Sequence, residues 1–170
     1  VLCASGALRA GAGLVTLCVP ESIWLAASSI APAPIMVRPM RKLSDVRDVR
    51  ADALVIGPGM GRSEHAAALL LKALHLPVPV VLDADALNCL AKDSTIWDLI
   101  PKGSILTPHL KEFDRLFGPS ETHLERMAKA KACCLKYDLN LVLKGANTLC
   151  SLSDGRQVFN CSGSKYMATA

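Results

Sequence analysis

Short runs of Val, Ile and Leu alternate along the chain with longer segments in which apolar residues recur at helical spacing. The apolar runs predict strands at residues 14–19, 35–37, 53–56, 80–82, 104–106 and 141–143. The intervening segments predict helices at residues 2–10, 63–75, 85–91, 110–117 and 121–137, with a further short helix opened by Pro20. Strands with no polar face that alternate with helices indicate a parallel sheet covered on both faces. The expected fold class is therefore α/β, a three-layer sandwich around a central, mostly parallel sheet.

The end of the chain departs from this alternation. Residues 148–152 and 157–159 flank Ser153-Asp154-Gly155, a turn sequence that predicts a β-hairpin. Residues 163–170 have the composition of a loop. Because no repeat, low-complexity segment or linker interrupts the chain, we expect residues 1–170 to form a single domain.

Composition excludes several classes of function. No apolar run approaches the roughly 18 residues of a membrane-spanning helix, so we expect no membrane partner. The net charge is only +4, with basic residues scattered among acids, and 4% of residues are aromatic. This composition argues against a nucleic-acid partner. The 7 cysteines form no CxxC pair and no zinc-like cluster, and we interpret them as buried free thiols of a cytoplasmic protein.

Unusual residues follow four of the predicted strands. In an open parallel sheet, ligands bind beyond the carboxyl ends of the strands, and these ends meet at one edge. The four segments are Gly57-Pro58-Gly59-Met60-Gly61, Asp83-Ala84-Asp85-Ala86-Leu87-Asn88, Thr107-Pro108-His109 and Lys144-Gly145-Ala146-Asn147-Thr148. We expect any ligand site to lie among them.

The glycine-rich segment from Gly57 to Gly61 has two interpretations. Glycines allow a backbone to approach an anion closely, and the helix predicted to follow adds a favourable field for phosphate. The same residues equally suit a tight strand-to-helix turn. The segment matches neither a Walker P-loop nor a dinucleotide fingerprint.

The acidic segment is also open to two interpretations. Asp83 could hold Mg²⁺ through water or accept a proton, or it could be an ordinary turn carboxylate. For Asp85 we favour a helix N-cap. Asn88 falls one helical turn later and could face the same cleft. No set of side chains is identified as a metal site.

The only histidine at a predicted strand end is His109. It could donate to a polar substrate group or act in acid–base chemistry. Alternatively it begins a helix, with Glu112 three residues later completing a capping arrangement. The other histidines, His65, His75 and His123, are expected to be solvated on helix faces.

Lys144 ends a predicted strand just before a glycine. Lys144, the Gly145 backbone and the Thr148 hydroxyl can together contact a phosphate by charge, N–H and O–H. An ordinary strand exit is the alternative.

Six segments in order closely resemble the ADP/ATP-dependent NAD(P)H-hydrate dehydratases of the ribokinase-like superfamily. They are LRAGAGLVTLCVPES, ADALVIGPGMGR, PVVLDADALN, ILTPHLKEFDRL, LVLKGANTL and CSGSKYMATA. The resemblance covers essentially the whole chain. It implies repair of the hydrated cofactors NADHX and NADPHX, in which ADP or ATP, with Mg²⁺, phosphorylates the ring hydroxyl. Phosphate then leaves, restoring NADH or NADPH.

The resemblance also implies roles for particular residues. Gly59 and His109 match substrate-contacting positions of the family. The nucleotide-binding positions match Lys144, Gly145, Ala146, Asn147 and Thr148. Apart from the resemblance, the strand-end segments offer Gly57, Asp83, Asn88 and Glu112 as candidate supporting residues.

The chain departs from the family pattern in two ways. Lys111 stands where the family usually carries Gly. The family also continues into a GxGD segment whose Asp is the catalytic base, which we expect beyond Ala170, and it begins with a glycine-rich strand expected before Val1. We therefore expect no catalytic residue within the chain and no turnover by residues 1–170 alone.

Two other functions remain open. One is a ribokinase-like kinase for a vitamin precursor such as hydroxyethylthiazole, and the other is a non-catalytic nucleotide-binding module. The preference for ADP or ATP, a homo-oligomeric state, and fusion to or pairing with an NAD(P)HX epimerase are open as well.

Overall fold

The computed structural model describes residues 1–162, so the segment predicted as a loop at residues 163–170 lies outside the described residues. The chain divides into two compact units, Val1–Val49 (unit 1) and Arg50–Ala170 (unit 2), and each is described by itself.

Unit 1 is a small parallel ribbon with helices. Its elements are α1 (Leu2–Arg9), β1 (Val15–Pro20), α2 (Glu21–Ile30), β2 (Ile35–Met40) and the 3₁₀ helix η1 (Leu43–Asp48). The two strands pair in parallel, with Val15 opposite Ile35. The prediction that residues 14–19 form a buried strand is wrong on burial, since only Val19 of β1 is buried. In a two-stranded sheet each strand has one neighbour, so much of its surface stays open.

Unit 2 contains a six-stranded sheet. Its elements are β3 (Leu54–Ile56), α3 (Glu64–Leu74), β4 (Val80–Leu82), α4 (Asp85–Lys92), the 3₁₀ helix η2 (Ser94–Leu99), β5 (Ile105–Leu106), α5 (Leu110–Phe117), α6 (His123–Tyr137), β6 (Asn140–Leu143), β7 (Thr148–Ser151) and β8 (Gln157–Asn160). The strand order is β3-β4-β5-β6-β7-β8. Strands β3 to β6 run parallel to one another, and the pairs β6–β7 and β7–β8 are antiparallel. The predicted α/β class and the predicted C-terminal hairpin are both confirmed.

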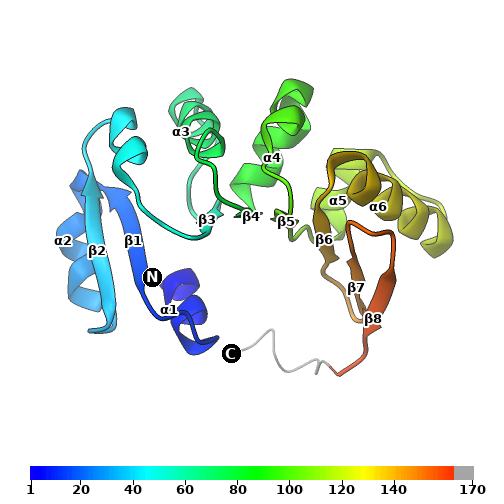
Figure 1. Ribbon diagram of the computed structural model, residues 1–170, viewed down its shortest axis with the longest axis horizontal. Coiled ribbons are helices and arrows are strands. Elements are labelled where there is room, and N and C mark those ends of the chain that lie inside the picture. Colours follow the sequence, from blue (N-terminus) through cyan, green and yellow to red (C-terminus); the bar gives the residue numbers. More distant parts are fainter. Residues whose placement is uncertain (163–170) are drawn as a thin grey trace. The chain divides into compact units, whose positions relative to one another are not determined.

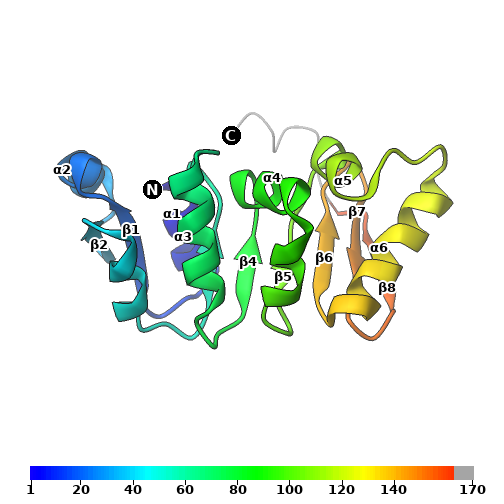
Figure 2. The same cartoon turned by 90° about the horizontal axis from the view of Figure 1, so that it is seen from above.

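The helices of unit 2 lie over one face of its sheet (Figures 1 and 2). The parallel strands follow each other in sequence order, and right-handed crossovers in one direction put every connecting helix on the same side. The core forms between these helices and the sheet. Its fully buried side chains include Leu70, Leu82, Leu106, Phe113 and Leu141.

Local sequence signals account for several helix boundaries. The Ser63 hydroxyl caps α3 by accepting the Ala66 N–H at 3.2 Å, as its sequence predicts. Thr122 caps α6 in the same way, so this helix begins two residues after the predicted start. Asp138 ends α6 in the left-handed conformation, with φ 51°. The helices η1 and η2 were not predicted, because a turn or two of 3₁₀ helix leaves no apolar period to detect.

The cysteines are only partly as predicted. All seven are free, but Cys3, Cys18 and Cys161 are exposed and Cys150 is partly buried. Cys89, Cys133 and Cys134 are buried on helices. Burial raises the pKa of Cys133 to about 12 and that of Cys134 to about 11, which keeps both thiols protonated at neutral pH.

Two further predictions concern exposed histidines and membrane-spanning helices. His65, His75 and His123 are exposed, as predicted. Within residues 1–162, even the longest helix, α6 with 15 residues, falls short of the length and apolar character needed to cross a membrane.

Candidate functional site

The four unusual segments meet at one edge of the unit 2 sheet. Strands β3, β4, β5 and β6 are adjacent and parallel, so their carboxyl ends lie side by side. Gly57, Asp83, Thr107 and Lys144 each follow one of these strands directly. The predicted juxtaposition is confirmed, and we call this row of strand ends the carboxyl edge.

The glycine segment forms a tight turn that is closely packed at Gly57 and loosely packed at Gly59. Gly57 has φ 122°, and a Cβ added there would lie 1.8 Å from the Asp83 carbonyl oxygen. The Met60 N–H donates to the Gly57 carbonyl at 3.1 Å, and Gly59 at φ 69° occupies the position that a type II turn reserves for glycine. Among residues 1–162, no heavy atom beyond the adjoining residues lies within 4 Å of a Cβ added at Gly59. Gly57 is therefore required by packing, whereas the space at Gly59 is open.

The Asp83 segment contains a strained turn. The Ala86 N–H donates to the Asp83 carbonyl at 3.1 Å across Ala84, which has φ 50° and ψ −115°. This region normally belongs to glycine, and an alanine there costs on the order of 1–3 kcal/mol. The strain could not be predicted from the sequence, because alanine carries no signal for a positive φ.

The prediction that Asp85 caps α4 is wrong. Ala84 occupies the N-cap position and Asp85 is the first residue of the helix. The Asp85 carboxylate instead accepts the Gly61 N–H at 2.9 Å, with Arg62 Nε at 4.0 Å. The strained turn directs this carboxylate towards the glycine segment, so it ties two strand exits together.

Lys144 and Asp83 form an ion pair across the site. Lys144 Nζ lies 2.7 Å from Asp83 Oδ1, although the two residues follow β6 and β4 and are separated by β5. The Lys144 N–H donates to the Pro108 carbonyl at 2.8 Å, which attaches its backbone to the β5 exit. The side chains are 44% and 28% exposed, so both remain accessible to a ligand.

His109 is the N-cap of α5. Its Nδ1 accepts the N–H groups of Lys111 at 3.1 Å and Glu112 at 3.3 Å, and the Glu112 carboxylate accepts the His109 N–H at 2.9 Å. The predicted capping arrangement is confirmed. Because Nδ1 is an acceptor here, the ring proton of the neutral imidazole resides on Nε2, which lies 3.4 Å from Glu112 Oε1. The ring is 49% exposed, so capping leaves it accessible.

The segment from Lys144 to Thr148 is the turn of a hairpin between β6 and β7. Gly145, Ala146 and Asn147 are exposed, and the Thr148 hydroxyl donates to the Gly145 carbonyl at 3.4 Å. Asn88, predicted as a supporting residue, accepts from Arg115 Nη1 at 3.0 Å. This contact joins α4 to α5, and Arg115 was not identified from the sequence because it looks like any solvated helix cation.

The carboxyl edge offers little for a metal ion by itself. Within residues 1–162, no three His, Cys, Asp or Glu side chains are grouped to hold one. The carboxylates of Asp83 and Asp85 already accept from Lys144 and Gly61. Mg²⁺ commonly keeps several waters and binds through substrate phosphates with one or two carboxylates. The described residues thus do not form a dedicated magnesium cage.

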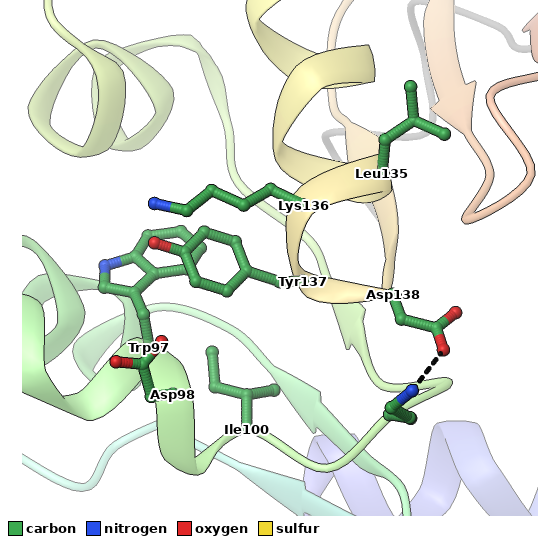
Figure 3. A pocket seen from close by; sticks show the side chains of 8 residues that line it. Trp97, Asp98, Ile100, Leu135, Lys136, Tyr137 and Asp138 are labelled. Atoms are coloured by element: carbon green, nitrogen blue, oxygen red, sulfur yellow. Dashed lines mark ion pairs between the residues drawn. The ribbon is translucent and has the colours of Figure 1, made fainter.

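A cavity of about 470 Å³ lies at the opposite edge of the sheet, before the starts of β5 and β6. Figure 3 shows Lys136 over the Tyr137 ring beside Trp97. Lys136 Nζ is 4.6 Å from the Tyr137 ring centroid, and the Tyr137 and Trp97 centroids are 4.9 Å apart. A hydrogen bond to Tyr137 raises the pKa of Lys136, and Lys102 pairs with Asp138 at 3.3 Å. We call this row of strand starts the amino edge, and both lysines that line its cavity, Lys102 and Lys136, contact neighbouring side chains.

Comparison with known proteins extends over the whole sequence. A family model described as NAD(P)H-hydrate dehydratase matches residues 1–170. A bifunctional NAD(P)H-hydrate repair enzyme from Moorella thermoacetica is 35% identical over 183 residues, covering 99% of this chain. The chain spans 34% of the length of that relative.

Solved structures share the fold. The ADP/ATP-dependent NAD(P)H-hydrate dehydratase from Bacillus subtilis, co-crystallised with ATP and Mg²⁺, superposes with a TM-score of 0.77 at 28% identity, over 98% of this chain and 62% of its own. A ribokinase-like protein from Enterococcus faecalis reaches a TM-score of 0.82 at 24% identity, over 97% and 58% of the respective chains, and supports the fold alone.

Proposed function

From the premise that this chain belongs to the NAD(P)H-hydrate dehydratase family, we propose that its protein repairs hydrated nicotinamide cofactors at the carboxyl edge. The substrates are NADHX and NADPHX, and the phosphoryl donor is ADP or ATP. The observation that carries the proposal is the placement of Gly59, His109 and Lys144 at the carboxyl edge, after β3, β5 and β6, with His109 paired directly to Lys144. Such an edge is where open parallel sheets bind their ligands.

The reaction has two stages. The terminal phosphoryl group of ADP or ATP passes to the ring hydroxyl of the hydrate, leaving AMP or ADP. The phosphate then departs with the hydroxyl oxygen while the ring loses a proton, and NADH or NADPH is formed. From the family resemblance we expect the catalytic base to be the Asp of a GxGD segment. No residue of the present chain is therefore assigned that role.

The nucleotide is assigned to Lys144, Gly145, Ala146, Asn147 and Thr148. An ammonium next to an exposed turn can neutralise phosphate charge while the turn backbone donates N–H groups. Mg²⁺ would enter with the nucleotide phosphates, where its role is to neutralise their charge. The likeness to a dehydratase co-crystallised with ATP and Mg²⁺ supports this assignment.

The hydrated nicotinamide is assigned to His109 and Gly59. The Nε2–H of His109 can donate to the ring hydroxyl or the carboxamide oxygen of the substrate. In the described part of the chain, nothing beyond the adjoining residues lies within 4 Å of a Cβ added at Gly59, which leaves room for a ligand to approach the backbone. Gly57 and Glu112 support these two residues by packing and by capping.

The wider setting follows from the same premise. We expect residues 1–170 to form one ribokinase-like domain from units 1 and 2, because the family model spans both. An NAD(P)HX epimerase, fused or separate, is the expected companion, since the Moorella relative is named as a bifunctional repair enzyme. The free thiols suit the reducing cytoplasm.

The decisive experiment is NADHX consumption by the full-length protein with ADP or ATP. We expect NADH absorbance to rise with equimolar release of AMP from ADP, or of ADP from ATP. A stable phosphorylated substrate in place of NADH would indicate a kinase, and absence of consumption with either nucleotide would overturn the proposal.

A further inference from the structure

The Asp83–Lys144 ion pair joins residues at the ends of two strands that are not neighbours in the sheet. Adjacent strands lie about 4.8 Å apart, so two residues separated by one strand have backbones roughly 10 Å apart. The pair closes this gap to 2.7 Å between Nζ and Oδ1. The Lys144 ammonium therefore lies away from its own strand β6, towards β4 and above the end of β5.

The backbone of Asp83 is held from both sides. Its N–H donates to the Ile56 carbonyl at 3.1 Å, and its carbonyl accepts the Ala86 N–H at 3.1 Å. Gly57 packs so closely on the same carbonyl that no Cβ could be accommodated. The strained Ala84 follows directly. These contacts hold the Asp83 backbone in place and so set the direction in which its carboxylate points towards Lys144.

Stability alone does not account for this arrangement. A partly exposed ion pair contributes little to the free energy of folding, and the strain at Ala84 costs as much or more. Strained backbone of this kind persists where the surrounding structure enforces it, and it is concentrated at functional sites. The feature that the strained turn supports here is the direction of one carboxylate and, through it, one ammonium.

We propose that Asp83 is the positioning residue for Lys144, holding its ammonium above the end of β5, between the bound nucleotide and the His109 ring. The inference rests on the proposed function, in which Lys144 contacts the phosphate being transferred. In this arrangement the Asp83 carboxylate competes with phosphate for the ammonium during binding, and it directs the ammonium towards the transferred group during reaction. Asp83 therefore contributes to kcat without strengthening nucleotide binding.

The test compares D83N with wild type in the full-length protein, using ADP, Mg²⁺ and NADHX. Misdirecting a group by about 1 Å can cost on the order of 100-fold in rate, so we expect kcat to fall about 10- to 100-fold. The dissociation constant for ADP, measured by calorimetry, should stay the same or tighten by up to about 3-fold, because a competing carboxylate is gone. D83E keeps the charge and should recover part of kcat.

A matched control is D138N, which removes the carboxylate paired with Lys102 at the amino edge. Asn adopts the left-handed conformation of Asp138 readily, and kcat should equal that of wild type. Weaker ADP binding by D83N that depends on Mg²⁺ would overturn the inference in favour of a metal ligand. Unchanged kcat with a lowered melting temperature would overturn it in favour of a structural pair. If wild type itself fails to convert NADHX, the proposed function fails first.

Discussion

At the carboxyl edge Lys144 reaches past one strand to Asp83, whereas at the amino edge Lys136 lies on the ring of its neighbour Tyr137. Both edges belong to the same sheet and both carry lysines and aspartates. At the carboxyl edge, charged groups are held by strained or glycine-dependent backbone and remain accessible. At the amino edge, charges cover aromatic rings and close a helix end.

The two edges differ in the kind of contact that each sheet end makes. Around Trp97 the rings of Phe117 and Tyr137 pack at centroid distances of 5.7 and 4.9 Å, which buries apolar area with little strain. At the carboxyl edge, strands end and helices begin, and the side chains of His109 and Lys144 remain accessible to a ligand. Substitutions at the two edges should therefore have separable effects on stability and on ligand binding.

The largest effect should come from G57A, which attacks the backbone that holds the carboxyl edge. The added Cβ would overlap the Asp83 carbonyl, and φ 122° is strained for alanine. We expect the free energy of unfolding to fall by about 4–5 kcal/mol, measured by urea denaturation. G59A at φ 69° meets open space and should cost only about 1–2 kcal/mol. Equal losses at the two glycines would contradict the packing assigned to Gly57.

W97A tests the amino edge. The ring is 8% exposed and packs between two other aromatic residues. Loss of a buried tryptophan costs about 3–5 kcal/mol, and the lower end applies here because the neighbouring cavity admits water. Below the melting temperature, the dissociation constant for ADP should match that of wild type. Weakened binding by the folded variant would show that the two edges are coupled.

The next effect concerns binding at the carboxyl edge. K144A removes a charge-assisted phosphate contact and should weaken ADP binding by about 1.5–3 kcal/mol, measured by calorimetry. The matched variant K102A removes an ion-paired lysine from the amino edge and should leave ADP binding unchanged. Unchanged affinity in K144A, or an equal loss in K102A, would refute the assignment of the nucleotide to the Lys144 segment.

Much of this comparison was predictable from the sequence. The apolar runs gave β3 to β6 within a residue or two, and parallel pairing then placed Gly57, Asp83, His109 and Lys144 at one edge. The glycine turn and the capping role of Glu112 followed from local rules that depend on few residues.

Contacts that depend on tertiary geometry were not predictable. The Asp83–Lys144 pair joins residues 61 positions apart, and its partners are chosen by strand order. The role of Asp85 was predicted wrongly because helix capping depends on a one-residue boundary, which the strained Ala84 displaces. The aromatic packing at Trp97 depends on η2, a 3₁₀ helix without an apolar period.

The smallest effect on stability is expected at His109, whose ring caps α5 and is the proposed substrate contact. H109A removes the acceptor for two backbone N–H groups and should lower the free energy of unfolding by about 1 kcal/mol. If Nε2–H also donates to the substrate, turnover of NADHX by the full-length protein should fall by about 10-fold, the equivalent of one hydrogen bond. ADP affinity should be preserved, because the proposed nucleotide site is the separate Lys144 segment.

H109N separates the two roles of the ring. Asparagine is a strong N-cap, so H109N should recover the melting temperature of wild type, and its amide keeps one donor for the substrate. Because that donor sits on a shorter side chain, turnover should be recovered only in part. Full turnover in H109A together with a lowered melting temperature would leave His109 with capping alone and would move substrate recognition to the open backbone at Gly59.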